Sequence, residues 1–362
     1  MSEPRVLILD DNVNSRRLLS KALDADPGLE VVGTSSLGEI GLEKLLHVRP
    51  DCVLLGLSSK GMETRLLQSL EEMNHLHPKL PILVVSSVAE RGSPLAIESL
   101  SKGAAGFSFI PSMEPEANPA VLLETIRACV ASKLKQIGTP CGDKARHAMP
   151  APTCKPAPVS RRNGAIQAVV IGVSTGGPNV LAAILSELPA SMPVPIFIVQ
   201  HMPPSFIRSL AARLDSSCPL RVCEASEGAE PLPSTVWLAP GDRHMELIRH
   251  GNKVKITLTD APPENSCRPA ADVLFRSAAK VYGDSLLAVV LTGMGSDGLR
   301  GCREIKAAGG TIVVQDEATS VVWGMPGHVA EAGLAHEILP LQRIAAELTR
   351  RVGRASSASR TR

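Results

Sequence analysis

Short apolar runs alternate with helical periodicities along two long stretches of the chain, and this alternation restricts the fold more than any other feature. In the first stretch, residues 5–136, apolar residues recur with helical spacing between the runs. One more helical pattern follows the fifth run, at Val121, Leu122, Ile126 and Val130. Repeated strand–helix units predict a parallel sheet with helices on both faces. The five predicted strands are Val6–Leu9, Val31–Val32, Cys52–Leu55, Ile82–Val85 and Gly106–Phe109.

The second stretch begins at Ala165 and follows the same α/β pattern. Its middle part has closely spaced short strands and a turn around residues 250–252, which indicates antiparallel pairing. We therefore predict a doubly wound, mostly parallel sheet with an antiparallel edge. The predicted strands are Ala168–Ile171, Pro195–Gln200, Arg221–Glu224, Thr235–Leu238, Lys253–Leu258, Leu286–Leu291 and Thr311–Gln315. The predicted helices are Pro178–Leu188, Ser205–Leu214, Ala270–Val281, Leu299–Ala308 and Leu341–Arg351.

A stretch without periodicity separates the two patterns. Residues 139–163 contain five prolines and five lysines or arginines, a composition typical of an extended linker. We predict a regulatory domain over residues 1–136, a linker over 137–164, a catalytic domain over 165–352 and a basic tail over 353–362.

Composition excludes several classes of protein. A chain of 362 residues is long enough for two domains, and its net charge of +2 argues against an extended nucleic-acid interface. The longest apolar runs, such as Leu286–Leu291, are far shorter than the ~20 residues of a membrane span, and the N-terminus lacks the pattern of a secretory signal. The eight cysteines form no C-x-x-C pair, which predicts reduced thiols in a cytoplasmic protein and no zinc site.

The segment Val169–Pro178, VVIGVSTGGP, has the strongest chemical signal. It places Ser174 in a G-x-S-x-G pattern between an apolar strand and a helix. A serine on such a turn exposes its hydroxyl beside backbone N–H groups and the positive end of a helix dipole, as a nucleophile requires. The same letters also suit a phosphate-binding turn, although the lysine of a P-loop is absent and Pro178 follows the glycines.

A nucleophilic serine needs a base and an acid at neighbouring strand ends. Two histidines qualify: His201 ends the run PIFIVQ, and His244 lies in APGDRHMEL. Two aspartates qualify as the acid, because Asp297 and Asp242 both follow apolar strands. His201 is favoured over His244 by position, but these considerations leave the choice between the aspartates open.

Asp10 and Asp11 end the first predicted strand. Two adjacent carboxylates at that edge could hold Mg²⁺, or they could cap the helix that follows. The sequence leaves both interpretations open.

The first domain resembles the flavodoxin-like receiver domain of two-component response regulators over about residues 4–130. The family's acidic pair matches Asp10–Asp11, and its strand-four hydroxyl matches Ser86. Its phosphoacceptor aspartate is replaced by Gly56, and its lysine after strand five by Ile110. Asp51 precedes the strand and lies at the wrong edge to substitute. The resemblance therefore implies a degenerate receiver without a phosphoacceptor.

The second domain resembles the catalytic domain of the chemotaxis response regulator protein-glutamate methylesterases over residues 166–348. The resemblance implies that Ser174, His201 and Asp297 form the catalytic triad and that no cofactor is needed for catalysis. It places the oxyanion contacts on the backbone of Met294 and, from the position of the turn, of Thr175. The matching segments are IGVSTGGP at 171–178, QHMPPSF at 200–206, APGDRHMEL at 239–247, RPAADVLF at 268–275, LTGMGSDG at 291–298 and WGMPG at 323–327.

The implied reaction is hydrolysis of glutamate methyl esters on methyl-accepting chemotaxis receptors, with release of methanol, together with deamidation of receptor glutamines. A chemotaxis histidine kinase or another protein is the implied partner of the receiver. The receiver of this family covers the active site until it is phosphorylated, a switch that Gly56 would remove. A non-catalytic scaffold built on a decayed enzyme is the alternative, motivated by the altered receiver.

Overall fold

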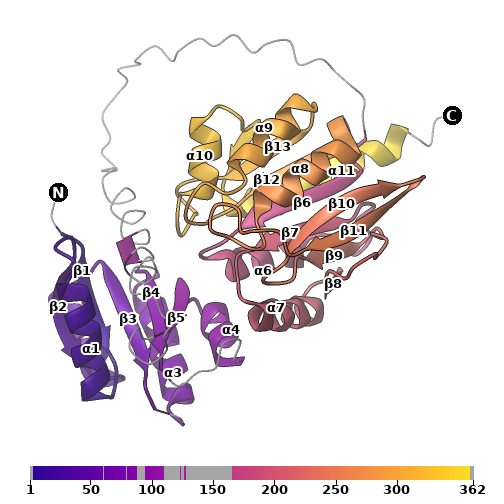
Figure 1. Cartoon of the computed structure of the whole chain (residues 1–362). Helices are drawn as coiled ribbons and strands as arrows, with labels where there is room; N and C mark the ends of the chain where they lie inside the picture. Colours follow the sequence, from indigo (N-terminus) through magenta and orange to yellow (C-terminus); the bar gives the residue numbers. More distant parts are fainter. Residues whose placement is uncertain are drawn as a thin grey trace.

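The protein consists of two α/β domains (Figure 1). The computed structural model describes residues 3–59, 61–78, 80–87, 94–109, 123, 126–127 and 165–358. The predicted linker, residue Ile110 and most of the helix predicted at Val121–Val130 lie outside the described residues.

The N-terminal domain has a five-stranded sheet in the order β2-β1-β3-β4-β5. All its neighbouring strands pair in parallel, which confirms the flavodoxin-like topology. Its strands are β1 (Arg5–Leu9), β2 (Glu30–Ser35), β3 (Cys52–Leu57), β4 (Ile82–Ser86) and β5 (Gly106–Phe109), and its described helices are α1 (Val13–Asp24), α2 (Glu39–Val48), α3 (Glu63–Leu76) and α4 (Pro94–Ser101).

The C-terminal domain has a seven-stranded sheet in the order β14-β13-β12-β6-β7-β9-β8. Each pair in it is parallel, so the carboxyl ends of all seven strands lie along one edge. The strands are β6 (Ala168–Val173), β7 (Ile196–Gln200), β8 (Arg221–Glu224), β9 (Thr235–Leu238), β12 (Leu286–Val290), β13 (Thr311–Gln315) and β14 (Glu337–Leu339).

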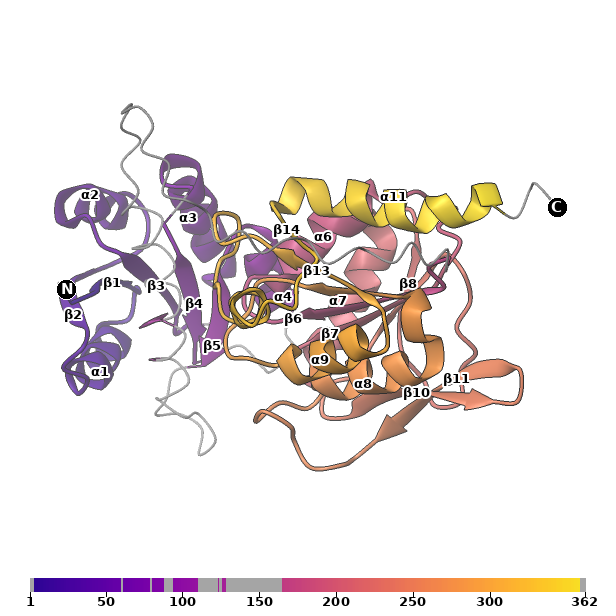
Figure 2. The ribbon, with the colours of Figure 1, turned by 90° about the horizontal axis from the view of Figure 1, so that it is seen from above.

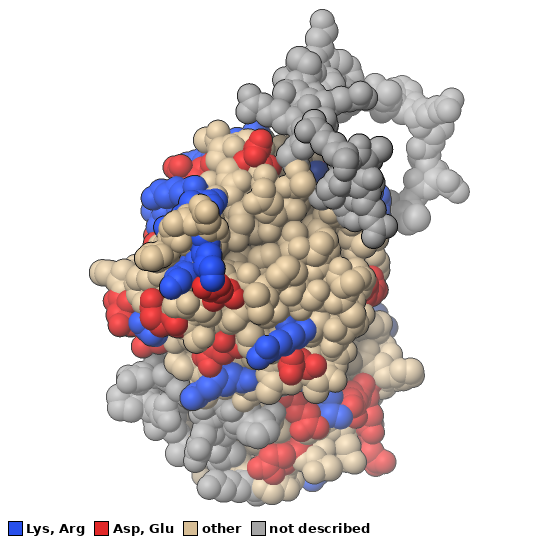
Figure 3. Space-filling model, turned by 90° about the vertical axis from the view of Figure 1, so that its right-hand side faces the viewer, with Lys and Arg blue, Asp and Glu red and all other residues tan. Residues whose placement is uncertain are grey.

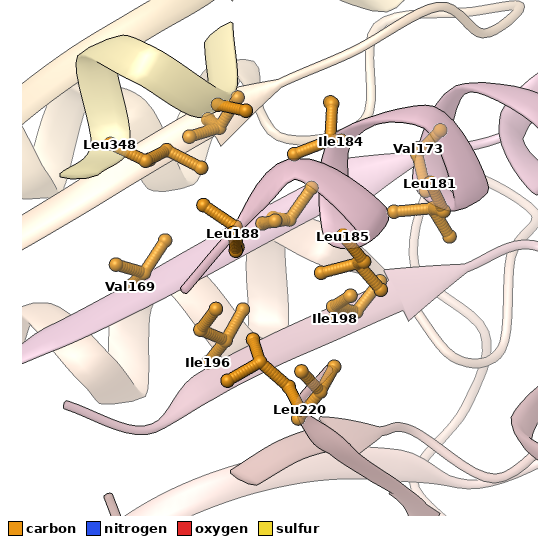
Figure 4. Packing of buried hydrophobic residues seen from close by; sticks show 14 of the residues in the cluster. Val169, Val173, Leu181, Ile184, Leu185, Leu188, Ile196, Ile198, Leu220 and Leu348 are labelled. Carbon is orange, nitrogen blue, oxygen red and sulfur yellow. The ribbon is translucent and has the colours of Figure 1, made fainter. Parts of the chain in front are cut away.

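Helices cover both faces of this sheet. Along β6, Val169, Ile171 and Val173 pack on one face, against α6 (Gly177–Glu187), α7 (Pro204–Ser217) and α11 (Leu341–Ala358). Figure 4 shows Val169 and Val173 beside residues of α6 and beside Leu348 of α11. The alternate residues Ala168 and Val170 pack on the other face, with α8 (Ala271–Tyr282), α9 (Leu299–Ala307) and α10 (Met325–Glu331). Burial of both faces explains why the central strands are continuous runs of Val, Ile and Leu.

The structure differs from the sequence prediction in five details. The antiparallel strands form a separate hairpin, β10 (His244–His250) and β11 (Lys253–Thr259), instead of an edge of the main sheet. The short elements β14 and α10 were not predicted, nor was β10 as a strand. Finally, α11 continues through Ala358, into the residues predicted as a basic tail.

The two domains contact each other through α4, α6 and α7. Helix α4 of the first domain packs against α6 and α7 of the second, as seen from above in Figure 2. The rings of Phe107 and Phe206 lie 6.1 Å apart, and Met202 packs against the apolar core of the first domain. Val322 belongs to a second apolar cluster of that domain, with Met294 packed against it.

In the described part of the chain, no helix is both long and apolar enough to cross a membrane. On the face drawn in Figure 3, the described basic and acidic side chains are interspersed around a broad area of other residues. This face therefore offers no extended basic stripe of the kind that binds nucleic acid.

Candidate active site

Three neighbouring strands bring the predicted catalytic residues to one edge of the C-terminal sheet. Ser174 follows β6, His201 follows β7, and Asp297 lies in the loop between β12 and α9. Strand β6 lies between β7 and β12, so residues distant in the sequence meet at adjacent strand ends. Ligand sites in parallel sheets gather at this edge.

The turn that carries Ser174 is fixed by backbone contacts. The Ser174 N–H donates to the Thr292 carbonyl at 3.0 Å, and the Gln200 amide donates to the Ser174 carbonyl at 3.0 Å. Gly176 has a φ of +81°, which favours glycine, and a Cβ at Gly177 would lie 1.9 Å from Gln200 Oε1. The two glycines after the serine are therefore required by the turn and by the Gln200 side chain.

The loop after β12 lies directly against Ser174. A Cβ at Gly293 would lie 2.8 Å from the Ser174 Cβ, so only glycine allows this approach. Met294, predicted as an oxyanion contact, is the next residue along this loop. The Thr292 hydroxyl donates to the Thr175 carbonyl at 2.9 Å and so links the two loops.

His201 and Asp297 form a hydrogen-bonded pair. His201 Nε2 lies 2.7 Å from Asp297 Oδ2, and their side chains are only 12% and 2% exposed. Among the described residues, the Ser174 hydroxyl has no hydrogen-bond partner, and His201 Nδ1 instead faces the Cys267 thiol at 3.6 Å. The structure thus joins two of the three predicted residues directly and leaves the serine hydroxyl free.

The Asp297 carboxylate sits at the N-terminus of α8. It accepts hydrogen bonds from the backbone N–H groups of Ala271 at 2.6 Å and of Asp272 and Gly298 at 3.0 Å each. Burial alone would raise the pKa of Asp297, but the hydrogen bonds from His201 and α8 outweigh it and lower that pKa. The carboxylate is therefore held in its charged form.

The same contacts act on the imidazole. Burial opposes the charged form of His201, but the hydrogen bonds to Asp297 and Cys267 outweigh burial and raise the pKa of His201 to about 9. The surroundings of the ring therefore favour its charged form.

His244 and Asp242, the alternative base and acid, are not bonded to each other or to Ser174 in the described part of the chain. His244 is buried, and its Nδ1 accepts the Ala270 N–H at 3.2 Å while its Nε2 lies 3.1 Å from the Pro262 carbonyl. Both its ring nitrogens are thus bound by backbone. Asp242 is exposed and pairs with Arg268 at 2.6 Å.

In the first domain, Asp10 occupies the space of the missing phosphoacceptor. A Cβ at Gly56 would lie 2.2 Å from Asp10 Oδ2. That oxygen accepts the hydroxyls of Ser15 at 2.6 Å and Ser58 at 2.5 Å, and Oδ1 accepts the Asn12 N–H at 2.8 Å. The carboxylate is therefore buried and satisfied by protein donors.

These contacts do not fit the Mg²⁺ site considered from the sequence. Asp10 is turned to hydroxyl and N–H donors, and Asp11 accepts the Leu37 N–H at 3.0 Å and faces Arg65 at 3.5 Å. No group of three metal-binding side chains occurs among the described residues. Nor does Asp10 cap α1: that role belongs to Asn12, whose side chain accepts the first N–H groups.

Sequence reasoning missed Asn265, Cys267 and Gln200. Asn265 contacts the Asp297 carboxylate, Cys267 faces His201, and Gln200 supports the serine turn. The Asn-Ser pair at 265–266 is a turn signal, but nothing in it indicates which carboxylate the turn approaches.

A parallel α/β domain whose strand ends carry Ser174, His201 and Asp297, joined to a flavodoxin-like domain, is the arrangement of a two-domain hydrolase. The family described as CheB methylesterase matches residues 169–348. A protein-glutamate methylesterase/protein-glutamine glutaminase of Trichodesmium erythraeum (strain IMS101) is 41% identical over 356 residues, which cover 98% of this chain and 100% of that relative. The protein of the same description from Nocardioides sp. (strain ATCC BAA-499 / JS614) is 42% identical, with 97% and 96% covered. The chain belongs to the protein-glutamate methylesterase family.

Two solved structures are similar to parts of the chain, and the first agrees with this assignment. The crystal structure of the Thermotoga maritima CheB methylesterase catalytic domain is 46% identical, has a TM-score of 0.50 and covers 51% of this chain and 97% of that domain. The response regulator domain of Thermotoga maritima CheB is 27% identical, with a TM-score of 0.32, and covers 36% of this chain.

Proposed function

We propose that this chain hydrolyses glutamate methyl esters on methyl-accepting chemotaxis receptors in the cytoplasm, giving glutamate and methanol, and deamidates receptor glutamines. The observation that carries the proposal is the buried His201–Asp297 hydrogen bond at the sheet edge that also presents Ser174. The names of the relatives supply the substrate class. The reaction serves adaptation in chemotaxis signalling.

In the proposed mechanism, Ser174 attacks the ester carbonyl and His201 accepts the serine proton. Since Nε2 is bound to Asp297, Nδ1 is the nitrogen that takes this proton, after the ring has left the Cys267 thiol. Catalytic hydrogen bonds of this kind commonly tighten only when substrate is bound. Asp297 orients the ring and stabilises its charged form.

The N–H groups of Thr175 and Met294 receive the oxyanion of the tetrahedral intermediate, a contact typically worth ~3 kcal/mol for each donor. His201 then donates its proton to the methoxide, and methanol leaves. Water, activated by the same imidazole, hydrolyses the acyl-enzyme and frees Ser174. For a glutamine substrate the leaving group is ammonia, and the other steps are unchanged.

A pocket of about 490 Å³ opens beside His201 and provides room for a receptor segment. It combines apolar side chains with the Asp242–Arg268 pair, which suits an amphipathic protein surface better than a small apolar ligand. Its lining includes Met202, Pro203, Pro204, Asp242, Cys267, Arg268 and Pro269.

The direct test uses the purified chain with membranes that contain methylated receptors. We expect release of methanol and covalent labelling of the chain by a fluorophosphonate, since both need an activated serine. Receptor binding without labelling or methanol would contradict the proposal and favour the scaffold alternative.

We further propose that the receiver restrains the esterase and no longer responds to phosphorylation. The receiver packs beside the catalytic edge through Phe107 and contacts the loop of Met294 through the Val322 cluster. Gly56 offers no phosphoacceptor, and Asp10 is bound by serine hydroxyls. A partner protein, such as a chemotaxis histidine kinase, would then act on the receiver by binding.

This regulation has a measurable signature. We expect residues 165–362 alone to release methanol several-fold faster than the full chain, while acetyl phosphate leaves the full-chain rate unchanged. Incubation of a typical receiver with acetyl phosphate under the same conditions is the control. Equal rates for the two forms would show that the receiver exerts no restraint, and a phosphoaspartate on the full chain would disprove the loss of phosphorylation.

A further inference from the structure

A tight turn lies over the His201–Asp297 pair. Glu264 and Cys267 exchange two backbone hydrogen bonds, of 3.1 and 2.9 Å. The two residues between them, Asn265 and Ser266, have φ values of +52° and +61°. Two consecutive residues with positive φ, enclosed by two backbone hydrogen bonds, are the pattern of a type I′ turn. Such a turn fixes the orientation of its side chains. We call residues 264–267 the clamp turn.

The clamp turn is anchored on α8. The Glu264 carboxylate accepts two parallel hydrogen bonds of 2.6 Å from the Arg276 guanidinium, and Arg300 of α9 lies 3.9 Å from the same carboxylate. Bidentate pairs of this kind fix orientation as well as distance. Because α8 also supplies two N–H groups to Asp297, the anchor and the catalytic carboxylate share one rigid element.

Asn265 connects the clamp turn to two carboxylates. Its amide nitrogen lies 2.9 Å from Asp297 Oδ1 and 2.9 Å from Asp272 Oδ2. Asp272 is fully buried and accepts the Gly301 N–H at 2.6 Å. The amide thus places a donor between two negative groups that would otherwise repel each other.

Cys267, at the other end of the turn, faces the imidazole. Its sulfur lies 3.6 Å from His201 Nδ1, the nitrogen opposite the one bound to Asp297. One turn therefore contacts both members of the pair, Asp297 through Asn265 and His201 through Cys267.

We propose that the clamp turn positions the Asp297 carboxylate for catalysis through Asn265, while its Cys267 contacts His201 only in the resting arrangement. This inference rests on the proposed esterase function. Asn265 acts through Asp297 and does not touch the reacting atoms, so it is a positioning residue.

The proposal predicts the pH dependence of the reaction. The amide N–H groups of Asn265 place partial positive charge against the Asp297 carboxylate. Their loss leaves that carboxylate more negative, and this raises the pKa of His201. Loss of the Cys267 thiol removes a group that raises the pKa of His201, and it acts in the opposite direction. The other charged or titratable groups around the pair are Asp272, Glu264 with Arg276 and Arg300, the buried Cys302 of α9, and the Asp242–Arg268 pair at the pocket.

The test compares Asn265→Gly with Ser234→Gly in the full-length chain. Both residues have a positive φ, so glycine keeps each backbone conformation, and Ser234 lies at the distant β8–β9 connection. The rate of fluorophosphonate labelling and of methanol release is measured from pH 6 to 10, and the melting temperature is recorded. For Asn265→Gly we expect a kcat roughly tenfold lower, as for loss of one charge-assisted hydrogen bond, with KM little changed.

The midpoint of the Asn265→Gly profile should move to higher pH and that of Cys267→Ala to lower pH, while Ser234→Gly resembles the wild type. An unchanged midpoint in Asn265→Gly would overturn the proposal, whether or not the melting temperature falls. If the wild type is labelled but releases no methanol from receptors, the proposed substrate is wrong while the labelling profiles still test the clamp turn. If the wild type is not labelled at all, both proposals fail.

Discussion

Substitution of Ser174 by alanine is expected to reduce methanol release by a factor on the order of 10⁴ or more. The His201–Asp297 pair and the proposed oxyanion donors remain in the variant, but no group is left to form the acyl-enzyme. The hydroxyl has no hydrogen-bond partner among the described residues, so its removal should leave the melting temperature nearly unchanged. Release of methanol from methylated receptors and thermal unfolding are the two measurements.

Ser186→Ala is the matched control for this variant. Ser186 lies at the other end of α6, and its hydroxyl donates to the Ala183 carbonyl within its own helix. Its replacement should leave both rate and stability close to the wild type. A Ser174→Ala variant that kept the rate of Ser186→Ala would remove Ser174 from the mechanism.

Asp297→Asn is expected to lower the rate by about 10⁴-fold, the loss typical of a triad whose acid becomes an amide. An asparagine cannot accept from Ala271, Asp272 and His201 together, since its NH₂ group would face donors. Loss of the negative charge also lowers the pKa of His201 from about 9. The base must be neutral to accept a proton, so the wild-type rate should rise toward pH 9, and the residual rate of the variant should level off at lower pH.

The measurement is the rate–pH profile of both proteins, with Asp260→Asn as the control. Asp260 is an exposed carboxylate that pairs with Arg243 at 2.9 Å, far more open to solvent than Asp297. The control should keep the wild-type profile. An Asp297→Asn profile with an unchanged midpoint would mean that the carboxylate does not set the charge of the imidazole.

The fold could be predicted largely because its central strands are buried on both faces. Runs such as Leu286–Val290 lie between two layers of helices and therefore consist of apolar residues without interruption. The elements that were missed lack this signal. Strand β14 has only three residues. Strand β10, HMELIRH, has only three apolar residues, and its last three residues are exposed.

The sequence pattern predicted which strand ends carry the candidate site, but it could not choose between two aspartates at such ends. The parallel-sheet rule brought Ser174, His201 and an aspartate to one edge, but it applied equally to Asp242. What distinguishes Asp297 is its place at the N-terminus of α8, a helix that begins 26 residues earlier in the chain. The contacts of Asn265 and Cys267 depend on the same tertiary arrangement, which no local pattern contains.

The contacts of the Asp10 carboxylate would affect signalling in addition to the absence of an aspartate at position 56. A typical receiver stays phosphorylated for a limited time after its kinase has acted, so its state reflects recent kinase activity. In this protein the space beside Gly56 is taken by the Asp10 carboxylate, which Ser15 and Ser58 hold. Under the proposed function, the adaptation set by this enzyme would carry no memory of past kinase activity and would follow only its abundance and its bound partners.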